Sequence, residues 1–343
     1  MIHPVPHDLG ATMVPTADGS HQSLEHFLEE SFTTSLIVMH RGETVYEWSR
    51  DPAAMDQPQP IYSITKSVVG VVAGALIEAE ALDPDRRVIT YVPELRHGGY
   101  RAVTVRDLLD MRTGDDYRET YGPDGELAQL ISTQILAVDA PFASVHDMLS
   151  RIDRVGRHDG PFAYRSLDTE ALGWVLERAT TTRMDMLATE IVLGPLGCEG
   201  AVFEVDALGD VLHSGGLRMR PVDVARFGAM ILNSGAVGDR HIVSPFFVKD
   251  LRAGHPCDDT PHVVQGSYRN QFWVPIRGGR ELLALGIHGQ MLWMDAETDT
   301  VFCKLSSWPT PSDPDLMTTT YAVARACAAA LTERPHRDIT IPR

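Results

Sequence analysis

A serine and a lysine lie three residues apart at the start of a long apolar segment, Ser63-Ile-Thr-Lys66. Three residues are nearly one helical turn, so both side chains would share one face of a helix. The unpaired N–H groups and positive dipole at a helix N-terminus suit a developing oxyanion. A partly desolvated lysine there would favour its deprotonated form and activate the serine. The pair therefore predicts nucleophilic catalysis by Ser63, with Lys66 as its proton partner.

The competing interpretation of this pair is a serine that caps the helix, followed by a solvated lysine. The scarcity of lysine favours a catalytic role for Lys66. The chain has 30 lysines and arginines together, and only Lys66, Lys249 and Lys304 among them are lysines. Arginine cannot lose its proton near neutral pH, so a lysine kept at a special position can do what arginine cannot.

Two further segments carry polar groups that could serve the same reaction. Tyr164 and Ser166 point the same way if their segment is extended, and a phenol near Ser63 could accept its proton and return it to a leaving group. The segment 286–291 (Gly-Ile-His-Gly-Gln-Met) lies between two predicted strands, where an edge N–H could donate to an oxyanion. Taken alone, Tyr164 and His288 also fit purely structural roles.

The elements that must position these residues are strands at both ends of the chain and helices between them. Periodicity and turn signals predict a hairpin over 35–48 and a buried helix over 63–82. Further helices are predicted over 105–111, 127–137, 169–180, 221–233, 245–251 and 321–331, and strands over 270–274, 282–287, 291–294 and 300–305.

This arrangement predicts an α+β fold with one antiparallel sheet built from the N- and C-terminal segments and flanked by helices. We expect residues 1–82 and 268–343 to form a discontinuous sheet-plus-helix domain, and residues 83–267 an inserted, mainly helical region. The length of 343 residues allows about two domains or one large one.

Composition excludes several classes of function. The formal net charge of −17 would repel phosphate backbones and anionic lipids, so we expect neither nucleic acid nor a membrane as partner. No basic and apolar leader opens the chain, which predicts a cytoplasmic protein. The four cysteines form no CxxC pair, and phosphate-loop, dinucleotide and zinc-protease motifs are absent, so neither a cofactor nor a metal is expected.

The order Ser-x-x-Lys, Tyr-x-Ser and His-Gly-Gln resembles the serine β-lactamase and penicillin-binding-protein superfamily. Within it the chain is most similar to the class C β-lactamase branch, which includes carboxylesterases and the 6-aminohexanoate-dimer hydrolases that cleave nylon oligomers. The phrases that carry the resemblance lie at 104–111, 214–228, 286–290 and 304–309, and the resemblance covers roughly residues 30–330.

The resemblance implies Ser63 as the acylated nucleophile, Lys66 as its proton partner and Tyr164 as general base and acid. It also implies an oxyanion hole formed by the backbone N–H of Ser63 and that of a residue just after Gly289, with Met291 preferred over Gln290. Ser166 occupies the place where many relatives have asparagine, and His288 and Gln290 stand in the substrate-gripping element.

Two departures from the family pattern determine which class of substrate we expect. His288-Gly-Gln290 replaces the Lys-Thr-Gly that grips the lactam carboxylate, and Ser166 replaces asparagine, so efficient β-lactam hydrolysis is not expected. A small linear amide, like a 6-aminohexanoate oligomer, or an ester is favoured. The alternatives are a carboxylesterase without amidase activity and a non-catalytic ligand-binding relative. The sequence leaves the oligomeric state open, a homodimer included.

Overall fold

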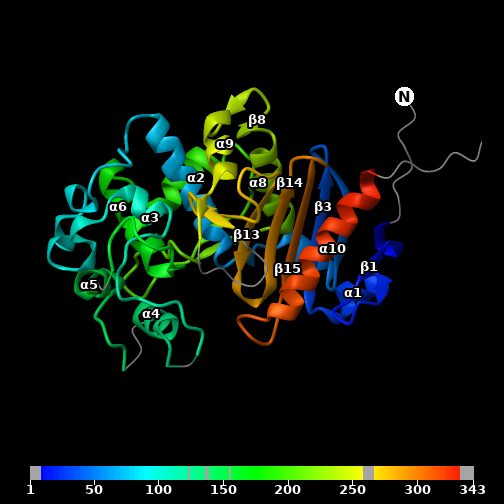
Figure 1. The fold of residues 1–343 in the computed structure, drawn as a ribbon, viewed down its shortest axis with the longest axis horizontal. Coiled ribbons are helices and arrows are strands. Elements are labelled where there is room, and N and C mark those ends of the chain that lie inside the picture. The colour runs from blue at the N-terminus through cyan, green and yellow to red at the C-terminus, as the bar shows by residue number, and fades with distance from the viewer. Residues whose placement is uncertain (1–8, 123, 136–138, 154–155, 258–265, 333–343) are drawn as a thin grey trace, which may run out of the picture.

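An antiparallel eight-stranded sheet forms the centre of the computed structural model (Figure 1), which describes residues 9–122, 124–135, 139–153, 156–257 and 266–332. The strands follow the order β10-β11-β12-β13-β14-β15-β3-β4 across the sheet. Their bounds are His255–Pro256 (β10), Ser267–Arg269 (β11), Phe272–Val274 (β12), Glu281–Gly286 (β13), Gln290–Asp295 (β14), Thr300–Ser306 (β15), Thr33–His40 (β3) and Glu43–Ser49 (β4).

The sheet joins the two ends of the described chain, because β3 pairs with β15 from Leu36 opposite Lys304 to His40 opposite Thr300. All seven residues of β15 are buried. A strand buried on both faces reads as a continuous apolar run rather than an alternating one, as these strands do. The α+β class and the sheet built from both ends of the chain are therefore confirmed.

Helices cover both faces of the sheet. One apolar cluster joins the sheet to α1 and α10, and a second joins it to α2 and α8. Figure 1 shows α10 crossing one face and the mainly helical part of the chain standing beside the sheet. The helices are α1 (Leu24–Glu30), α2 (Ile64–Glu78), α3 (Val105–Leu109), α4 (Glu126–Gln134), α5 (Val145–Arg151), α6 (Ser166–Thr180), α7 (Met184–Ala188), α8 (Pro221–Leu232), α9 (Pro245–Ala253) and α10 (Pro314–Thr332).

The division into 1–82 with 268–343 and 83–267 remains a prediction, and the structure adds detail to it. Helix α8 falls within 83–267, yet it packs on β3, β14 and β15. Strand β10, at His255–Pro256, also precedes residue 268 and joins the main sheet. A small sheet of β5 (Gln59–Pro60), β7 (Leu217–Met219) and β6 (Val202–Phe203) connects the segment before Ser63 to the part before α8.

The helix that carries Ser63 and Lys66 is buried over most of its length. Residues Ile64–Gly74 of α2 are all buried, as the all-round apolar sequence predicts. The helix ends at Glu78 rather than at residue 82, since Glu80 adopts a left-handed φ of 56° that interrupts helical geometry. This buried helix fixes the position of Ser63 at its N-terminus, close to the end of β13.

Other predicted bounds differ from the structure at segments of weak periodicity. Helix α10 begins at Pro314, seven residues before the predicted start at 321, because Pro314 suits a first helical turn. The predicted helix over 127–137 is seen as α4, and residues 136–138 lie outside the described part of the chain. Helix α1 and the strands β1 (Met13–Pro15) and β2 (His21–Ser23) were not predicted, since each is short.

Within the described residues, no helix combines the length and apolar character needed to cross a membrane.

Candidate active site

Ser63 and Lys66 lie side by side at the N-terminus of α2. Lys66 Nζ is 2.8 Å from Ser63 Oγ and donates to the Ser214 carbonyl oxygen at 2.7 Å. The Ser63 side chain makes no capping hydrogen bond, and Lys66 is only 1% exposed. These two observations contradict the alternative of a capping serine with a solvated lysine. Tyr62 precedes them with a left-handed φ of 44°, a backbone strain often found beside reactive residues.

The environment of Lys66 favours its neutral form more than water does. Burial lowers the pKa of Lys66 to about 8, while the charges of Glu119 and Glu170 act in the opposite direction. A free amine at this position can accept the Ser63 hydroxyl proton over the 2.8 Å contact.

Tyr164 lies against the same two residues. Its ring stacks on Trp273 with centroids 5.2 Å apart, and Lys66 Nζ lies 5.3 Å from the Tyr164 ring centroid. Burial raises the pKa of the Tyr164 phenol well above its ordinary value, although a hydrogen bond with Ser63 opposes this. The phenol is therefore protonated at neutral pH and can donate a proton.

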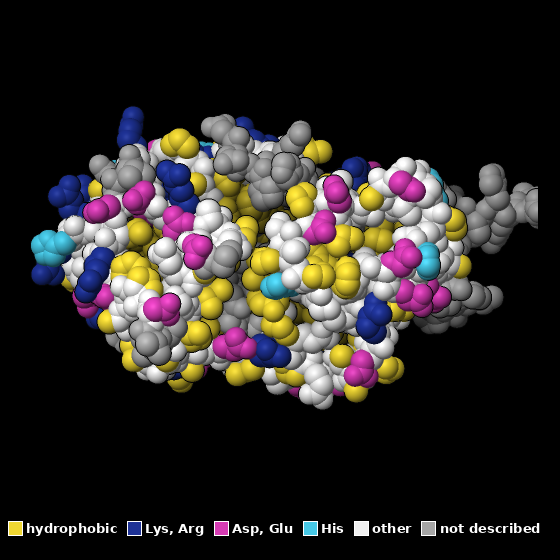
Figure 2. Space-filling view, turned by 90° about the horizontal axis from the view of Figure 1, so that it is seen from below, with side chains coloured by type: hydrophobic (Ala, Val, Ile, Leu, Met, Phe, Trp, Pro, Cys, Tyr) yellow, Lys and Arg dark blue, Asp and Glu magenta, His cyan; other side chains and the backbone are white. Residues whose placement is uncertain are grey.

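A cavity of about 100 Å³ opens directly over Ser63. Figure 2 shows hydrophobic side chains along the hollow between the helical part and the sheet. Of the described residues, those lining the cavity carry no charged side chain; they are Ser63, Tyr121, Tyr164, Trp273, Leu285, Gly286, Ile287, Pro311, Ser312, Pro314 and Met317.

The end of strand β13 forms one wall of this cavity. β12 pairs with β13 at Leu283 only, so the β13 edge beyond that residue is not covered by β12. Gly286 lies so close to the segment before Ser63 that a Cβ there would be 2.7 Å from the Ile61 carbonyl oxygen. Glycine is needed for this close approach of two backbone segments.

The preference for Met291 as an oxyanion donor does not fit this geometry. Met291 lies on β14 opposite Leu285, is fully buried, and does not line the cavity over Ser63. The element at the cavity is 285–287, on the preceding strand, because the tight turn at 287–289 carries the chain away from Ser63 before β14 begins.

His288, Gln290 and Ser166 also lie outside that cavity lining. The His288 ring contacts the Trp308 carbonyl oxygen at 2.8 Å, and the Gln290 amide donates to the carbonyl oxygens of Ile287, His288 and Ser306. Ser166, the first residue of α6, donates to Glu119 from its backbone N–H at 2.9 Å and its hydroxyl at 2.7 Å. All three residues make hydrogen bonds within the protein, and the substrate-binding role given to them remains a prediction.

The sequence reasoning missed three residues that surround the pair: Ser214, Glu170 and Glu119. Ser214 begins a phrase that had been noted only for its family resemblance, whereas Glu170 lies within α6 and Glu119 in a loop. Their contacts with Lys66 and Ser166 are long-range, and no local spacing could have indicated them.

Lys304 shows that a buried lysine is not by itself a catalytic one. It is fully buried on β15, donates to Ser306 Oγ at 2.5 Å, and lies over the rings of Phe27 and Trp308. Burial lowers the pKa of Lys304 to about 7. It has no part in the cavity over Ser63.

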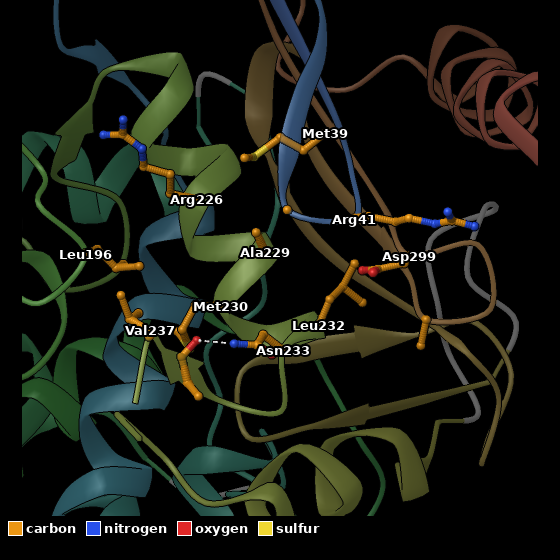
Figure 3. Close-up of a pocket in the computed structure, with 14 residues that line it drawn as sticks. Met39, Arg41, Leu196, Arg226, Ala229, Met230, Leu232, Asn233, Val237 and Asp299 are labelled. Atoms are coloured by element: carbon orange, nitrogen blue, oxygen red, sulfur yellow. Dashed lines mark hydrogen bonds between the residues drawn. The ribbon is translucent and has the colours of Figure 1, made fainter. Parts of the chain in front are cut away.

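A second, wider pocket of about 700 Å³ lies between α8 and the turns at 41–42 and 296–299 (Figure 3). Arg41, Arg226 and Asp299 supply its charges, and Asn233 donates to the Ala236 carbonyl oxygen at 3.0 Å. Among the described residues that line it there is no hydroxyl, thiol, imidazole or amine that could act as a nucleophile.

The fold agrees with comparisons to known proteins. A family model described as Beta-lactamase matches residues 23–326, and the chain belongs to this family. It is a serine hydrolase of the amidase and esterase kind.

Individual proteins of known name or structure are also similar to this chain. The chain is 33% identical over 298 residues to the 6-aminohexanoate-dimer hydrolase of Paenarthrobacter ureafaciens, covering 84% of this chain and 76% of that protein. A Bacillus anthracis structure provisionally assigned as a 6-aminohexanoate-dimer hydrolase superposes with a TM-score of 0.84 at 25% identity, covering 97% of this chain and 89% of that one. The D-amino acid amidase of Ochrobactrum anthropi SV3 shares the fold, with a TM-score of 0.67 at 16% identity over 89% of this chain and 98% of that one.

Proposed function

We propose that the protein hydrolyses a small linear amide or ester by a two-step acyl transfer through Ser63. The observation that carries this proposal is the contact between Ser63 Oγ and the buried Lys66 Nζ at the floor of a cavity that Tyr164 also lines. A serine activated by a neighbouring base, next to a proton donor, is the arrangement that nucleophilic catalysis requires.

In the first step, neutral Lys66 takes the Ser63 hydroxyl proton while Oγ bonds to the substrate carbonyl carbon. The proton then passes from Lys66, by way of the Tyr164 hydroxyl, to the leaving nitrogen or oxygen of the substrate. The bond between that leaving atom and the carbonyl carbon breaks. In the second step a water oxygen bonds to the acyl carbon and its proton passes to Tyr164 and Lys66. The bond between that carbon and Ser63 Oγ then breaks, Oγ takes the proton back from Lys66, and the acid is released.

Backbone N–H groups stabilise the negative charge that develops on the carbonyl oxygen in both steps. We propose the Ser63 N–H at the start of α2 and an N–H at Gly286–Ile287 on the uncovered β13 edge, which borders the same cavity. In this proposal the second N–H comes from Gly286–Ile287 and not from Met291, the residue that the family resemblance favoured.

The cavity lining favours a substrate whose chain next to the carbonyl is uncharged and mainly hydrocarbon. Trp273, Leu285, Ile287 and Met317 present apolar surface, and a charged group placed among them would lose its hydration without gaining a partner. A small linear amide of the kind cleaved by the relative from Paenarthrobacter ureafaciens, or an ester with a short alkyl chain, meets this requirement.

The test is intact-protein mass spectrometry of wild type and Ser63→Ala after brief exposure to an activated short-chain ester, with the matching linear amide assayed alongside. We expect one acyl adduct, or steady turnover, in wild type and neither in Ser63→Ala, whose circular dichroism spectrum should match wild type. Turnover that persists in Ser63→Ala, or a wild type that gives neither adduct nor turnover with any ester or amide tried, would refute the proposal.

A further inference from the structure

A buried histidine lies between two glutamates, one residue before Ser214, whose carbonyl oxygen contacts Lys66. His213 is 3% exposed; its Nδ1 is 3.0 Å from Glu170 Oε2 and its Nε2 is 3.4 Å from Glu177 Oε1. Both glutamates belong to α6, whereas His213 comes from the loop that leads into β7. The three side chains form an ion-paired cluster that the hydrolytic steps above do not use.

Helix α6 is shaped to receive this imidazole. Glu170, Gly173 and Glu177 follow one another at spacings of three and four, so they share one face of the helix. A Cβ on Gly173 would collide with the ring carbons of His213. Because Gly173 has no side chain, the His213 ring can lie against the helix backbone between the two carboxylates.

The cluster is connected to Lys66 through the residue that follows His213. Glu170 Oε1 accepts the Ser214 backbone N–H at 3.0 Å and the Ser214 hydroxyl at 2.6 Å. The other oxygen, Oε2, accepts the His213 backbone N–H at 3.1 Å. One carboxylate thus fixes two successive peptide units, and the Ser214 carbonyl that they orient receives the Lys66 ammonium at 2.7 Å.

We propose that His213, held between Glu170 and Glu177, is a positioning residue for the hydrolase: through Glu170 it fixes the Ser214 carbonyl, and thereby aligns Lys66 Nζ on Ser63 Oγ. This inference rests on the proposed function. Without a cation beside it, Glu170 would be a buried carboxylate with unbalanced charge, and such groups are costly enough to rearrange their surroundings.

The charges around His213 support this role. Burial alone would lower the pKa of His213, but the hydrogen bonds and charges of Glu170 and Glu177 raise it to about 9. The imidazole is therefore a cation at neutral pH. Other titratable groups also act on this cluster. His213 repels His146 of α5, Glu170 attracts Lys66 of α2, and Glu177 attracts Arg183, which precedes α7.

The experiment compares His213→Gln with Glu177→Gln, a matched variant at the outer end of the cluster that leaves the Glu170 contacts with Ser214 in place. Steady-state kinetics on an activated ester would be measured from pH 6 to 10, together with the rate at which a fluorophosphonate labels Ser63. Gly173→Ala serves as a second variant, because it displaces the ring without changing any charge.

We expect His213→Gln and Gly173→Ala to lower kcat and the labelling rate about 10- to 100-fold with little change in KM, since misplacement of reacting groups by about 1 Å costs on this order. Glu177→Gln should lose less than about 5-fold on the same scale. In His213→Gln the lower-pH limb of kcat/KM should also move to higher pH, because Glu170 would then act on Lys66 without its neighbouring cation.

Either of two results would overturn the inference: folded His213→Gln and Gly173→Ala enzymes whose kcat and pH profile match wild type, or equal losses in His213→Gln and Glu177→Gln with no movement of the pH limb. A wild type that neither turns over esters nor takes the label would overturn the proposed function itself, and the inference about His213 with it.

Discussion

At the scale of single residues, the pKa of Lys66 sets the expected pH dependence of the reaction. Lys66 must be neutral to take the Ser63 proton, and burial lowers its pKa to about 8. We therefore expect kcat/KM to rise about tenfold per pH unit up to roughly pH 8 and then to level off. The measurement is a pH profile with an activated ester.

Lys66→Arg tests the same residue by substitution. It should lower kcat/KM by about 10²- to 10⁴-fold, because arginine keeps its proton across this pH range. Lys249→Arg, at an exposed position of α9, is the matched control and should behave as wild type. A Lys66→Arg enzyme with more than a tenth of wild-type activity would contradict the role of Lys66 as a base.

The residues of the site divide into those that sequence spacing could indicate and those that it could not. Ser63 and Lys66 were found because one helical turn brings them together, and that contact is now observed. The roles given to these residues and to Tyr164 remain predictions until they are tested. Glu170 and Ser214 lie 44 residues apart in the chain, and only the fold brings them into contact.

At the scale of elements, the approach of strand β13 to the start of α2 brings the uncovered strand edge to Ser63. Gly286→Ala would place a methyl group 2.7 Å from the Ile61 carbonyl oxygen and force the two elements apart. We expect kcat/KM to fall about 10²-fold, as for a comparable displacement of reacting groups, while the thermal midpoint changes by a few degrees at most.

The control for Gly286→Ala is Gly122→Ala, since a Cβ at Gly122 would meet nothing within 4 Å. It should leave both the kinetics and the thermal midpoint at wild-type values. A Gly286→Ala enzyme as active as this control would show that the strand edge has no part in catalysis.

The third sequence motif shows why element bounds matter for function. Periodicity identified the strands over 282–287 and 291–294, which appear as β13 and β14. We nevertheless propose the second oxyanion donor on the other side of the turn from Met291, because His288, with a left-handed φ of 60°, reverses the chain between the two strands. Sequence alone does not say which edge of a hairpin faces a cavity, since that depends on packing against Ile61.

At the scale of the whole molecule, the net charge of −17 should oppose the compact state at low ionic strength. We expect the thermal midpoint at pH 7.5 to rise by a few degrees between about 10 and 200 mM NaCl, since salt screens this repulsion. The comparison is the same titration near the sequence pI of about 5.2, where no rise is expected. A midpoint that falls with salt at pH 7.5 would show that specific ion pairs outweigh the net repulsion.

The α+β architecture followed from strands at both ends of the chain with helices between, because a sheet made of such strands has to pair them across the intervening region. The eight-strand order, with β3 between β15 and β4, bears this out. The packing of α8 on the sheet could not be foreseen, because its apolar face shows that it is covered but not by which element.

The pairing of β3 with β15 has a consequence for how the enzyme comes into being during synthesis. When a ribosome has translated about the first 200 of these residues, Ser63 and Lys66 have been synthesised. The strand edge at Gly286 and the Ser214 carbonyl that contacts Lys66 have not. The nascent chain thus carries its nucleophile without the groups that make it reactive. If Ser63 acts as proposed, it acquires its reactivity only after the segment that includes Gly286 has been synthesised and has folded against the start of α2.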